Sequence, residues 1–475
     1  MLNWWLVVVA VIVALLILGV SVYFIILFTA DVDKGKAWFP KLVVLCGLFL
    51  SAAIILLIPF DVAARRDVTS VKSFSADEID TQTLWQVALW SAAVFIIVII
   101  PFTTFYYEGY DPDHQSFTQQ LGPAILYTFL LLVVAIVLLV LLWFTVGFAD
   151  LPFIAYSTAE QYRWVFDPNV LYVQSRTLST LPFQVSFFVY VVALLAFFGW
   201  LMFLVFGSVG LAALPYDYFH AHLTRPPPIS DGEFEGIKAE TASRAEGLLR
   251  ECDKLHKEQL SRNNMAVRRK IDALKIEVYD MLDEYERQKG AAHPLYVFWT
   301  VVNGGVGVMC FILSMLWILH ILIYGAIKHN EFLNTMLIAL DDAFPLLGVI
   351  AFCIFAFYLL FCCVKGCLKV GVRVACVTIH PLKVGDTLMN AMLFNVGMIL
   401  LISITVAHFT ATTFDKYIAG STIDTLLNVF VRYLRGIGIA MYYFQFIFPI
   451  LAVLSVTWVV CCPRKATDKP AADTK

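Results

Sequence analysis

No charged side chain interrupts Leu121–Phe148, which reads LGPAILYTFLLLVVAIVLLVLLWFTVGF. A helix needs about 20 mostly apolar residues to cross the roughly 30 Å hydrocarbon core of a bilayer, so this stretch is long enough to span it. The whole chain has the same character, with 60% apolar residues, 15% charged residues and a mean hydropathy of +0.81. Soluble domains average about 45–50% apolar and about 25% charged residues. The composition therefore predicts a polytopic membrane protein and excludes secreted, disordered and nucleic-acid-binding chains.

Nine stretches are long and apolar enough to span a bilayer, which predicts an all-α membrane protein with about nine transmembrane helices. The first stretch lacks the basic residues that precede the apolar core of a cleaved signal peptide, so we expect it to remain as a helix. The predicted spans are Asn3–Ala30, Pro40–Phe60, Leu84–Tyr106, Leu121–Phe148, Val185–Leu214, Tyr296–Tyr324, Asp341–Gly371, Asn390–Phe414 and Gly436–Cys462.

The distribution of basic residues predicts the orientation of these spans, because cytoplasmic loops are enriched in Lys and Arg. With the N-terminus outside, the inner segments carry 24 basic residues and the outer segments nine. The long segment 215–295 supplies thirteen of the 24, and without it the split is 11 to 9. None of the ten cysteines falls in a predicted outer loop, so we expect no disulfide framework there.

We therefore predict an integral membrane protein of the plasma membrane or of an endolysosomal or ER membrane. Its N-terminus would be outside or luminal and its C-terminus cytosolic. Four parts follow along the chain: helices one to five in residues 1–214, a cytosolic segment in 215–295, helices six to nine in 296–462, and a polar tail in 463–475.

The segment 215–295 is the main polar part of the chain. Arg225-Pro226-Pro227-Pro228 marks a linker, because proline disfavours helix interiors. Apolar residues then follow heptad spacing, most regularly from Val267 to Tyr285, and Arg262-Asn263-Asn264 interrupts the pattern. We predict a coiled-coil-like antiparallel helical hairpin that binds cytosolic protein partners through residues 234–290. The alternatives are a solvated linker and an intermolecular coil that joins two protomers in a homodimer.

No catalytic signature is present: Gly-x-Ser-x-Gly, His-Glu-x-x-His and the phosphate loop are all missing from the sequence. We therefore expect no enzymatic activity, no cofactor and no resident metal. Ionisable residues inside a membrane are costly, which makes them candidate functional residues. His320 and His408 lie in the sixth and eighth spans, where they would relay protons or pack as hydrogen-bonded residues. Asn390 and Asn395 begin the eighth span and would bond to neighbouring helices.

The predicted ligand site combines the outer loop 149–184 with the start of the seventh span. The loop contains Tyr162 and Trp164, aromatic residues that provide rigid contact area at recognition surfaces or anchor a protein at the bilayer interface. Asp341 and Asp342 open the predicted seventh span on the same side, either as ligand contacts or as partners of the helix dipole. We expect an outward-facing site rather than a route through the bundle, with an unknown extracellular or luminal ligand.

Cysteines gather beside basic residues at the inner ends of the seventh and ninth spans. Juxtamembrane cysteines of this kind are typical sites of S-palmitoylation, and the alternative is that they are free buried thiols. The candidates are Cys362, Cys363, Cys367, Cys461 and Cys462.

Several short motifs follow one another along nearly the whole chain. They are Phe39-Pro40-Lys41, Ile58-Pro59-Phe60-Asp61-Val62-Ala63-Ala64-Arg65, Pro101-Phe102 with Tyr107-Glu108, Leu333-Asn334 with Leu340-Asp341-Asp342, Thr378-Ile379-His380-Pro381-Leu382-Lys383 with Thr387-Leu388-Met389-Asn390 and Leu393-Phe394-Asn395-Val396-Gly397, and Leu434-Arg435-Gly436-Ile437. In this order they resemble the limb-region and lipocalin-interacting membrane receptor (LIMR) family, most specifically in residues 380–397. The family-motif residues singled out here are Asp61, Arg65, Glu108, His380, Pro381 and Lys383.

The resemblance implies endocytic uptake of lipocalin-like or lipophilic cargo, modulation of membrane signalling or, in a related branch, release of cobalamin from lysosomes. This chain departs from common members in its outer loops, since loop 149–184 has no cysteine. Internal repeats are typical of transporters, and none relates the first four spans to the last four. We therefore predict a multi-pass receptor or scaffold, with a lysosomal small-molecule transporter of the cobalamin type as the alternative.

Overall fold

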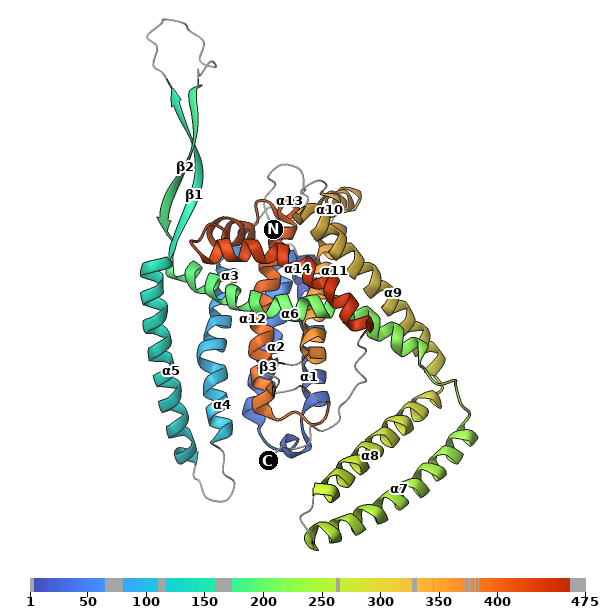
Figure 1. Ribbon diagram of the computed structural model, residues 1–475. Helices are drawn as coiled ribbons and strands as arrows, with labels where there is room; N and C mark the ends of the chain where they lie inside the picture. The colour runs from blue at the N-terminus through green and yellow to red at the C-terminus, as the bar shows by residue number, and fades with distance from the viewer. Residues whose placement is uncertain are drawn as a thin grey trace, which may run out of the picture. The chain divides into compact units, whose positions relative to one another are not determined.

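The computed structural model describes residues 4–64, 80–109, 117–158, 173–261, 265–326, 331–344, 346–370, 372–374, 377–379, 382 and 384–461. Within these ranges, nine helices are long and apolar enough to cross a membrane, which confirms the predicted fold class (Figure 1). They are α1 (Trp4–Phe28), α2 (Trp38–Ala64), α3 with η2 and α4 (Thr81–Val94, Phe95–Ile99 and Ile100–Glu108), α5 (Phe117–Val146), α6 (Phe187–Leu223), α9 with η3 (Tyr296–His320 and Ile321–Ala326), α11 (Leu347–Val370), α12 (Met389–Thr413) and α14 (Ile437–Cys461).

Shorter elements connect the spans. The one-turn η1 (Asp31–Asp33) precedes α2, and α10 (Phe332–Ala343) precedes α11. After α12 come the single turn α13 (Asp415–Ile418) and the π-helix η4 (Asp424–Val431). These elements lie at the ends of the spans, where the backbone leaves the bundle.

The seventh span begins later than the sequence predicted. Helix α10 ends at Ala343, and Phe344 is extended, with φ −149° and ψ 123°. A new helix then starts at Leu347. Asp341 and Asp342 therefore lie at the end of α10 and do not open the seventh span. The prediction failed because the sequence from Asp341 onward becomes apolar without a visible break, although the chain forms two separate helices there.

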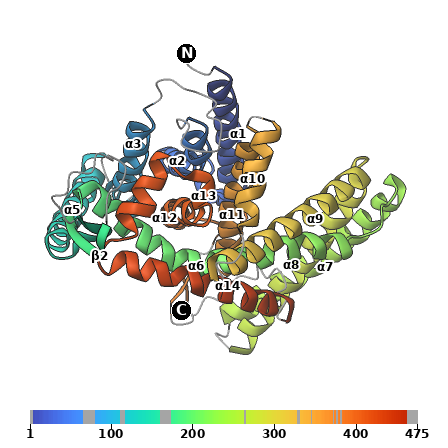
Figure 2. The same cartoon turned by 90° about the horizontal axis from the view of Figure 1, so that it is seen from above.

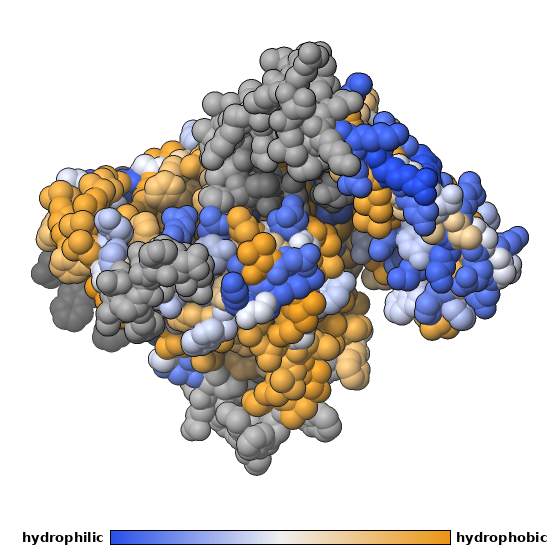
Figure 3. Space-filling model, turned by 90° about the horizontal axis from the view of Figure 1, so that it is seen from below, coloured by the Kyte–Doolittle hydropathy of each residue, from blue (hydrophilic) through white to orange (hydrophobic). Residues whose placement is uncertain are grey.

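The chain forms two compact units, one of residues 1–213 and 315–456 and the other of residues 214–314 and 457–475. Helix α12 lies at the centre of the first unit, between α2, α11 and α6 (Figure 2). It is buried along almost its whole length, whereas α1 and α5 expose most of their apolar side chains. Figure 3 shows this exposed apolar surface in orange. Apolar surface of this extent fits the hydrocarbon core of a bilayer.

Two glycines let α6 and α11 approach until their backbones touch. A Cβ atom on Gly210 would overlap the carbonyl oxygen of Cys362, and one on Gly366 would overlap the carbonyl oxygen of Phe206. Small residues at such crossings are the main means by which helices associate inside membranes. Any side chain at either position would force the two helices apart.

A two-stranded antiparallel sheet follows α5, made of β1 (Phe148–Thr158) and β2 (Val173–Gln184). Its register runs from Phe148 opposite Gln184 to Ser157 opposite Ser175, and it extends away from the ends of α5 and α6 (Figure 1). These strands were not predicted, since Pro152 lies in one of them and proline is unusual in strand interiors. In a two-stranded sheet both strands are edge strands, so proline is tolerated. A second small sheet pairs β3 (Val372–Val374) with β4 (Val377–Ile379).

The second unit contains α7 (Asp231–Ser261) and α8 (Met265–Ala291). At the start of α7, the backbone N–H of Ser230 donates to Glu233 over 2.8 Å, and the N–H of Glu233 donates to the Ser230 hydroxyl over 3.4 Å. This reciprocal pair is the capping box of a helix N-terminus. The hydrogen bonds that Ser230 donates to the Glu233 carboxylate lower the pKa of Glu233.

Helices α7 and α8 pack as an antiparallel hairpin, which confirms the helical hairpin predicted for this segment. The Phe234 ring lies 5.9 Å from the Tyr285 ring, and Leu248, Leu255 and Leu274 form the core between the helices. The predicted heptad pattern is only partly used, because Val278 and Cys252 are exposed. The predicted turn at Asn263-Asn264 lies outside the described residues.

Candidate functional site

Asp61 joins three helices at the end of the first unit from which the β1–β2 hairpin extends. It lies in the last turn of α2 and is 1% exposed. Its carboxylate accepts hydrogen bonds from the indole N–H of Trp85 (3.0 Å) in α3 and from the backbone N–H groups of Thr422 (3.3 Å) and Ile423 (2.8 Å) before η4. A carboxylate is favoured at a helix N-terminus, because the unpaired N–H groups there are partly positive. Asp61 thus fixes the start of η4 and ties it to the second turn of α3 through Trp85.

The other helix starts at this end of the unit have their own caps. Asp80 accepts from the backbone N–H of Thr83 over 3.1 Å and from its hydroxyl, and these hydrogen bonds lower the pKa of Asp80. Ser186 accepts from the backbone N–H of Val189 over 3.3 Å and caps α6. Ser421 accepts from the backbone N–H of Asp424 over 3.3 Å and caps η4. Three capped helix N-termini therefore meet in one region.

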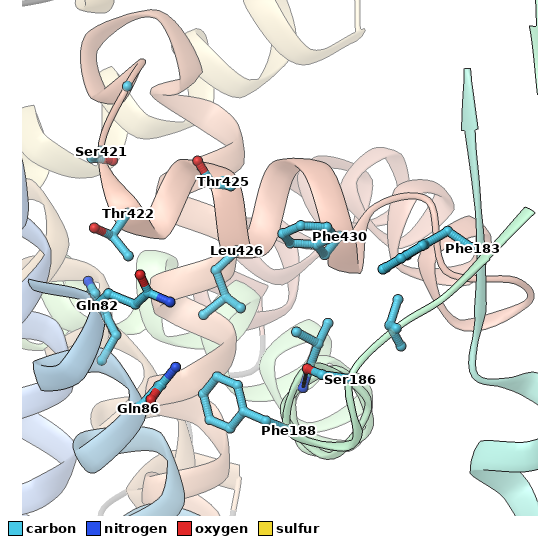
Figure 4. A pocket seen from close by; sticks show the side chains of 14 residues that line it. Gln82, Gln86, Phe183, Ser186, Phe188, Ser421, Thr422, Thr425, Leu426 and Phe430 are labelled. Atoms are coloured by element: carbon cyan, nitrogen blue, oxygen red, sulfur yellow. Dashed lines mark hydrogen bonds between the residues drawn. The ribbon is translucent and has the colours of Figure 1, made fainter. Parts of the chain in front are cut away.

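A cavity of about 460 Å³ lies among these three helix starts (Figure 4). Its lining comes from the first turns of α3 and α6, the end of β2, and residues 420–430. Polar side chains include Gln82, Gln86 and Thr425, and aromatic side chains include Phe183 and Phe430. Pockets of about 300–1,000 Å³ with mostly apolar walls and a few polar groups are typical of small-molecule sites. The cavity is therefore the candidate functional site.

The hairpin that contributes Phe183 to the cavity is fixed at its base by the segment before α14. Arg435 forms a bidentate ion pair with Asp150, with N–O distances of 2.8 and 2.7 Å, and its guanidinium lies over the Phe148 ring. Ala149 and Leu434 form a β-bridge. The hydrogen bonds from Arg435 lower the pKa of Asp150 and raise that of Arg435. The Leu434-Arg435 motif is thus a clamp on the hairpin.

The structure describes the two carboxylates of the predicted ligand site but not its two aromatic residues. Asp341 accepts from the backbone N–H groups of Gly348 (2.8 Å) and Val349 (3.3 Å) and from the hydroxyl of Tyr417 (2.7 Å). It therefore caps α11 and holds α13. Asp342 is exposed, and neither carboxylate lines the cavity. Tyr162 and Trp164 lie outside the described residues.

The two intramembrane histidines are buried and contact other parts of the bundle. The indole N–H of Trp200 donates to Nδ1 of His408 over 2.9 Å. Nε2 of His320 lies 3.2 Å from the carbonyl oxygen of Thr413, which also receives a hydrogen bond from the Asn334 side chain (3.4 Å). The last carbonyl groups of a helix have no partner within it, so these side chains satisfy the end of α12. Nδ1 of His320 has no hydrogen-bond partner among the described residues.

The predicted asparagines lie near the start of α12. The side chain of Asn390 accepts from the backbone N–H of Ala391 over 2.7 Å, and the side chain of Asn395 donates to the Ala391 carbonyl over 2.8 Å. Both of these bonds are local to α12.

Asp33 is a buried residue that the sequence analysis missed. It accepts from the Tyr107 hydroxyl (3.0 Å) and from the backbone N–H of Met389 (3.2 Å), so it joins α4 to the start of α12. Lys41 donates to the carbonyl oxygens of residues 33, 34 and 36. Several family motifs therefore converge on a structural network here. Glu108 is exposed, and Arg65, His380, Pro381 and Lys383 lie outside the described residues.

The cysteine candidates differ in accessibility. Cys362, Cys363 and Cys367 are buried, Cys461 is exposed, and Cys462 lies outside the described residues. An acyl group can be attached to a thiol only where the thiol is accessible, which favours Cys461. Among the residues that the structure describes, no group of three or more His, Cys, Asp or Glu side chains could hold a metal ion.

Sequence reasoning also missed the polar residues of the cavity. Gln82 and Gln86 lie four residues apart at the start of an apolar span, and Thr425 lies in an amphipathic stretch after α12. Amide side chains that share one face of a membrane helix could have signalled a polar contact. Their partner segment is more than 300 residues away in the sequence, so the cavity itself was not predictable.

Comparison with known proteins gives similarity over nearly the whole chain. The profile of the LMBR1-like membrane protein family matches residues 6–289 and 274–461. A LIMR family protein of Dictyostelium discoideum is 32% identical over 520 residues, which cover 99% of both chains. LIMR family proteins of Arabidopsis thaliana (31% identity, 96% of each chain) and Oryza sativa subsp. japonica (32% identity, 96% of this chain and 95% of the other) are similar. No solved structure matches the chain.

Proposed function

The chain belongs to the LIMR family of LMBR1-like membrane proteins, and on that premise we propose that it is a receptor or scaffold whose ligand occupies the cavity described above. The observation that carries the proposal is the position of this cavity at the base of the β1–β2 hairpin. Phe183 belongs to both the hairpin and the cavity wall. A bound ligand would therefore contact a segment that extends away from the bundle and could change its position.

The orientation follows from the charge distribution. Nine crossings put the two termini on opposite sides of the membrane, and the 24-to-9 split of basic residues favours an outer or luminal N-terminus. The β1–β2 hairpin and the cavity are then outer or luminal. The α7–α8 hairpin is cytosolic, and it exposes Leu249 (66%) and Leu282 (51%) to protein partners.

The buried histidines support a receptor over a transporter. His408 already receives a hydrogen bond from Trp200, and His320 contacts the end of α12. Proton relays in transporters need ionisable side chains that line a water-filled path. Aromatic rings pack against both histidines: the Trp200 ring lies 6.0 Å from that of His408, and the Phe414 ring lies 5.2 Å from that of His320.

The proposal is tested by asking which small molecules co-purify with the protein. Leu426→Trp places a larger side chain in the cavity, whereas Val429→Trp makes the same kind of change on η4 at an exposed position outside it. Full-length wild type and both variants are purified in mild detergent, and the bound molecules are identified by mass spectrometry. We expect at least one enriched species that Leu426→Trp loses and Val429→Trp retains. Loss in neither or in both variants would refute the cavity as the ligand site.

Orientation has an independent test. A cysteine introduced at Thr180 in β2 should react with a membrane-impermeant thiol reagent in intact cells or in sealed vesicles with the luminal face outward. A cysteine introduced in the tail 463–475 should react only after permeabilisation. The reverse labelling pattern would overturn the proposed orientation. It would not bear on whether the cavity binds a ligand, which the co-purification experiment tests separately.

A further inference from the structure

The cavity has no charged side chain in its described wall, which restricts the ligand. None of the fourteen lining residues is Asp, Glu, Lys, Arg or His. An ion bound there would gain no counter-ion from the described wall, whereas an uncharged ligand needs none. The wall therefore selects against ligands that are charged at neutral pH.

The three helix N-termini around the cavity do not change this conclusion. Uncapped helix N-termini attract anions, because their free N–H groups point at the ligand. Here the first N–H groups already donate to Asp61 before η4, to Asp80 at α3 and to Ser186 at α6. Two of these three caps are carboxylates, which neutralise the positive ends of the η4 and α3 dipoles. A phosphate or carboxylate head group would gain little from them.

The two glutamines lie toward one end of the cavity, with the Phe188 ring on their side and Ser186 on the other (Figure 4). Figure 4 shows Gln82, Gln86 and Thr422 at one end and Phe183 and Phe430 at the other. The structure gives the side-chain amides of both glutamines no hydrogen-bond partner among the residues that it describes. An amide can donate and accept, so these groups match a hydroxyl or an ester. The phenylalanine rings match an apolar body.

The cavity lies at the depth where an apolar span meets water. Gln82 and Gln86 belong to the first two turns of the span that starts at Thr81, and Phe188 belongs to the first turn of α6. Beside them, Val87 (60% exposed) and Trp90 (39% exposed) present apolar surface on α3. A lipid with its head group at the interface can thus reach the cavity by lateral diffusion within one leaflet.

From this geometry we propose that the ligand is an uncharged amphiphile of about sterol size, which enters from the bilayer and places its hydroxyl group against Gln82 and Gln86. This inference rests on the proposed function, because it names the chemical class of the ligand for the same cavity. The volume of about 460 Å³ suits one compact molecule better than a two-chain phospholipid.

The test uses photo-crosslinking to the full-length protein in lipid nanodiscs. One probe is a sterol that carries a diazirine and an alkyne, and the other is a fatty acid with the same two groups. The crosslinked peptides are identified by mass spectrometry. We expect the sterol to label peptides from α3 or from residues 420–430, unlabelled sterol to compete, and the fatty acid to label these peptides at least tenfold less.

Two variants test the assigned contacts. Gln86→Leu removes an amide of the polar end, whereas Val87→Leu changes the exposed neighbour that does not line the cavity. Sterol labelling should fall at least fivefold in Gln86→Leu and stay within twofold of wild type in Val87→Leu. Labelling of wild type by the fatty acid as strongly as by the sterol, or equal sterol labelling of both variants, would overturn the inference. The proposed function would still stand if a different molecule co-purified with wild type and was lost in Leu426→Trp but retained in Val429→Trp.

Discussion

Replacement of Asp61 by alanine should loosen the start of η4, because this carboxylate holds the backbone there. The side chain is buried and accepts from Trp85 and from the N–H groups of Thr422 and Ile423. In Asp61→Ala all three donors lose their acceptor at once. The change lies outside the cavity wall, so its effect on the cavity would be transmitted through α3 and η4.

The magnitude follows from the number of bonds. A hydrogen bond to a charged acceptor contributes about 1.5–3 kcal/mol, so the loss of the two bonds from the buried residues Trp85 and Ile423 should cost about 3–6 kcal/mol. For the single bond to the N–H of Ile423, about 1.5–3 kcal/mol corresponds to about ten- to a hundredfold, because 1.4 kcal/mol is a factor of ten. The amide hydrogens of residues 422–425 should exchange faster by about that factor.

The assay is hydrogen–deuterium exchange of the detergent-solubilised protein, followed in peptides that cover 421–427, together with thermal unfolding. Asp61→Asn should be intermediate, since its carbonyl oxygen in the place of Oδ2 can still accept from Trp85 and Ile423, while its amide N–H₂ in the place of Oδ1 cannot accept from Thr422. Asp342→Ala, which removes an exposed carboxylate, should stay within about 0.5 kcal/mol of wild type. Unchanged exchange in Asp61→Ala, with unchanged thermal stability, would refute this role of the residue.

Three further perturbations test other parts of the structure. Because Arg435 lowers the pKa of Asp150, their ion pair should persist as the pH falls to about 4, the ordinary Asp range, and be lost only below it. Hydrogen exchange at the base of the β1–β2 hairpin, corrected for intrinsic rates, should become faster only below that pH. In Arg435→Gln these amide hydrogens should lose their protection from exchange already at neutral pH. Trp200→Phe should destabilise the protein by about 1–3 kcal/mol, seen as a lower unfolding temperature, because a buried histidine nitrogen loses its donor. Gly210→Ala should cost about 1–3 kcal/mol by pushing α11 away, whereas Gly19→Ala, which meets open space inside α1, should not destabilise the protein.

The transmembrane helices could be predicted from the sequence because the cost of burying polar backbone in lipid forces long uninterrupted apolar helices. The predicted boundaries of the sixth span, Tyr296 and Tyr324, agree with the structure. The start of the seventh span was wrong, since hydropathy alone does not separate α10 from α11. The α7–α8 hairpin was also predictable, because heptad spacing reports which residues can meet along one face.

The candidate site could not be predicted in the same way. The cavity brings together Gln86, Phe183 and Leu426, which are far apart in the sequence and carry no common motif. Phe183 also belongs to β2, and a two-stranded sheet with proline in both strands has no clear alternating pattern. Asp61 was selected through a family resemblance, but only the structure shows that it holds the start of η4 beside the cavity.

The most direct test of whether a ligand occupies the cavity is a cryo-electron microscopy map of the full-length protein purified in mild detergent with its native lipids. We expect an elongated density among α3, α6 and η4, with its polar end at Gln82 and Gln86 and its apolar end at Phe183 and Phe430. Leu426→Trp should remove this density without changing the surrounding helices. A ligand density beside His320 or His408 within the bundle, with the cavity empty, would overturn the proposed ligand site and favour a transporter.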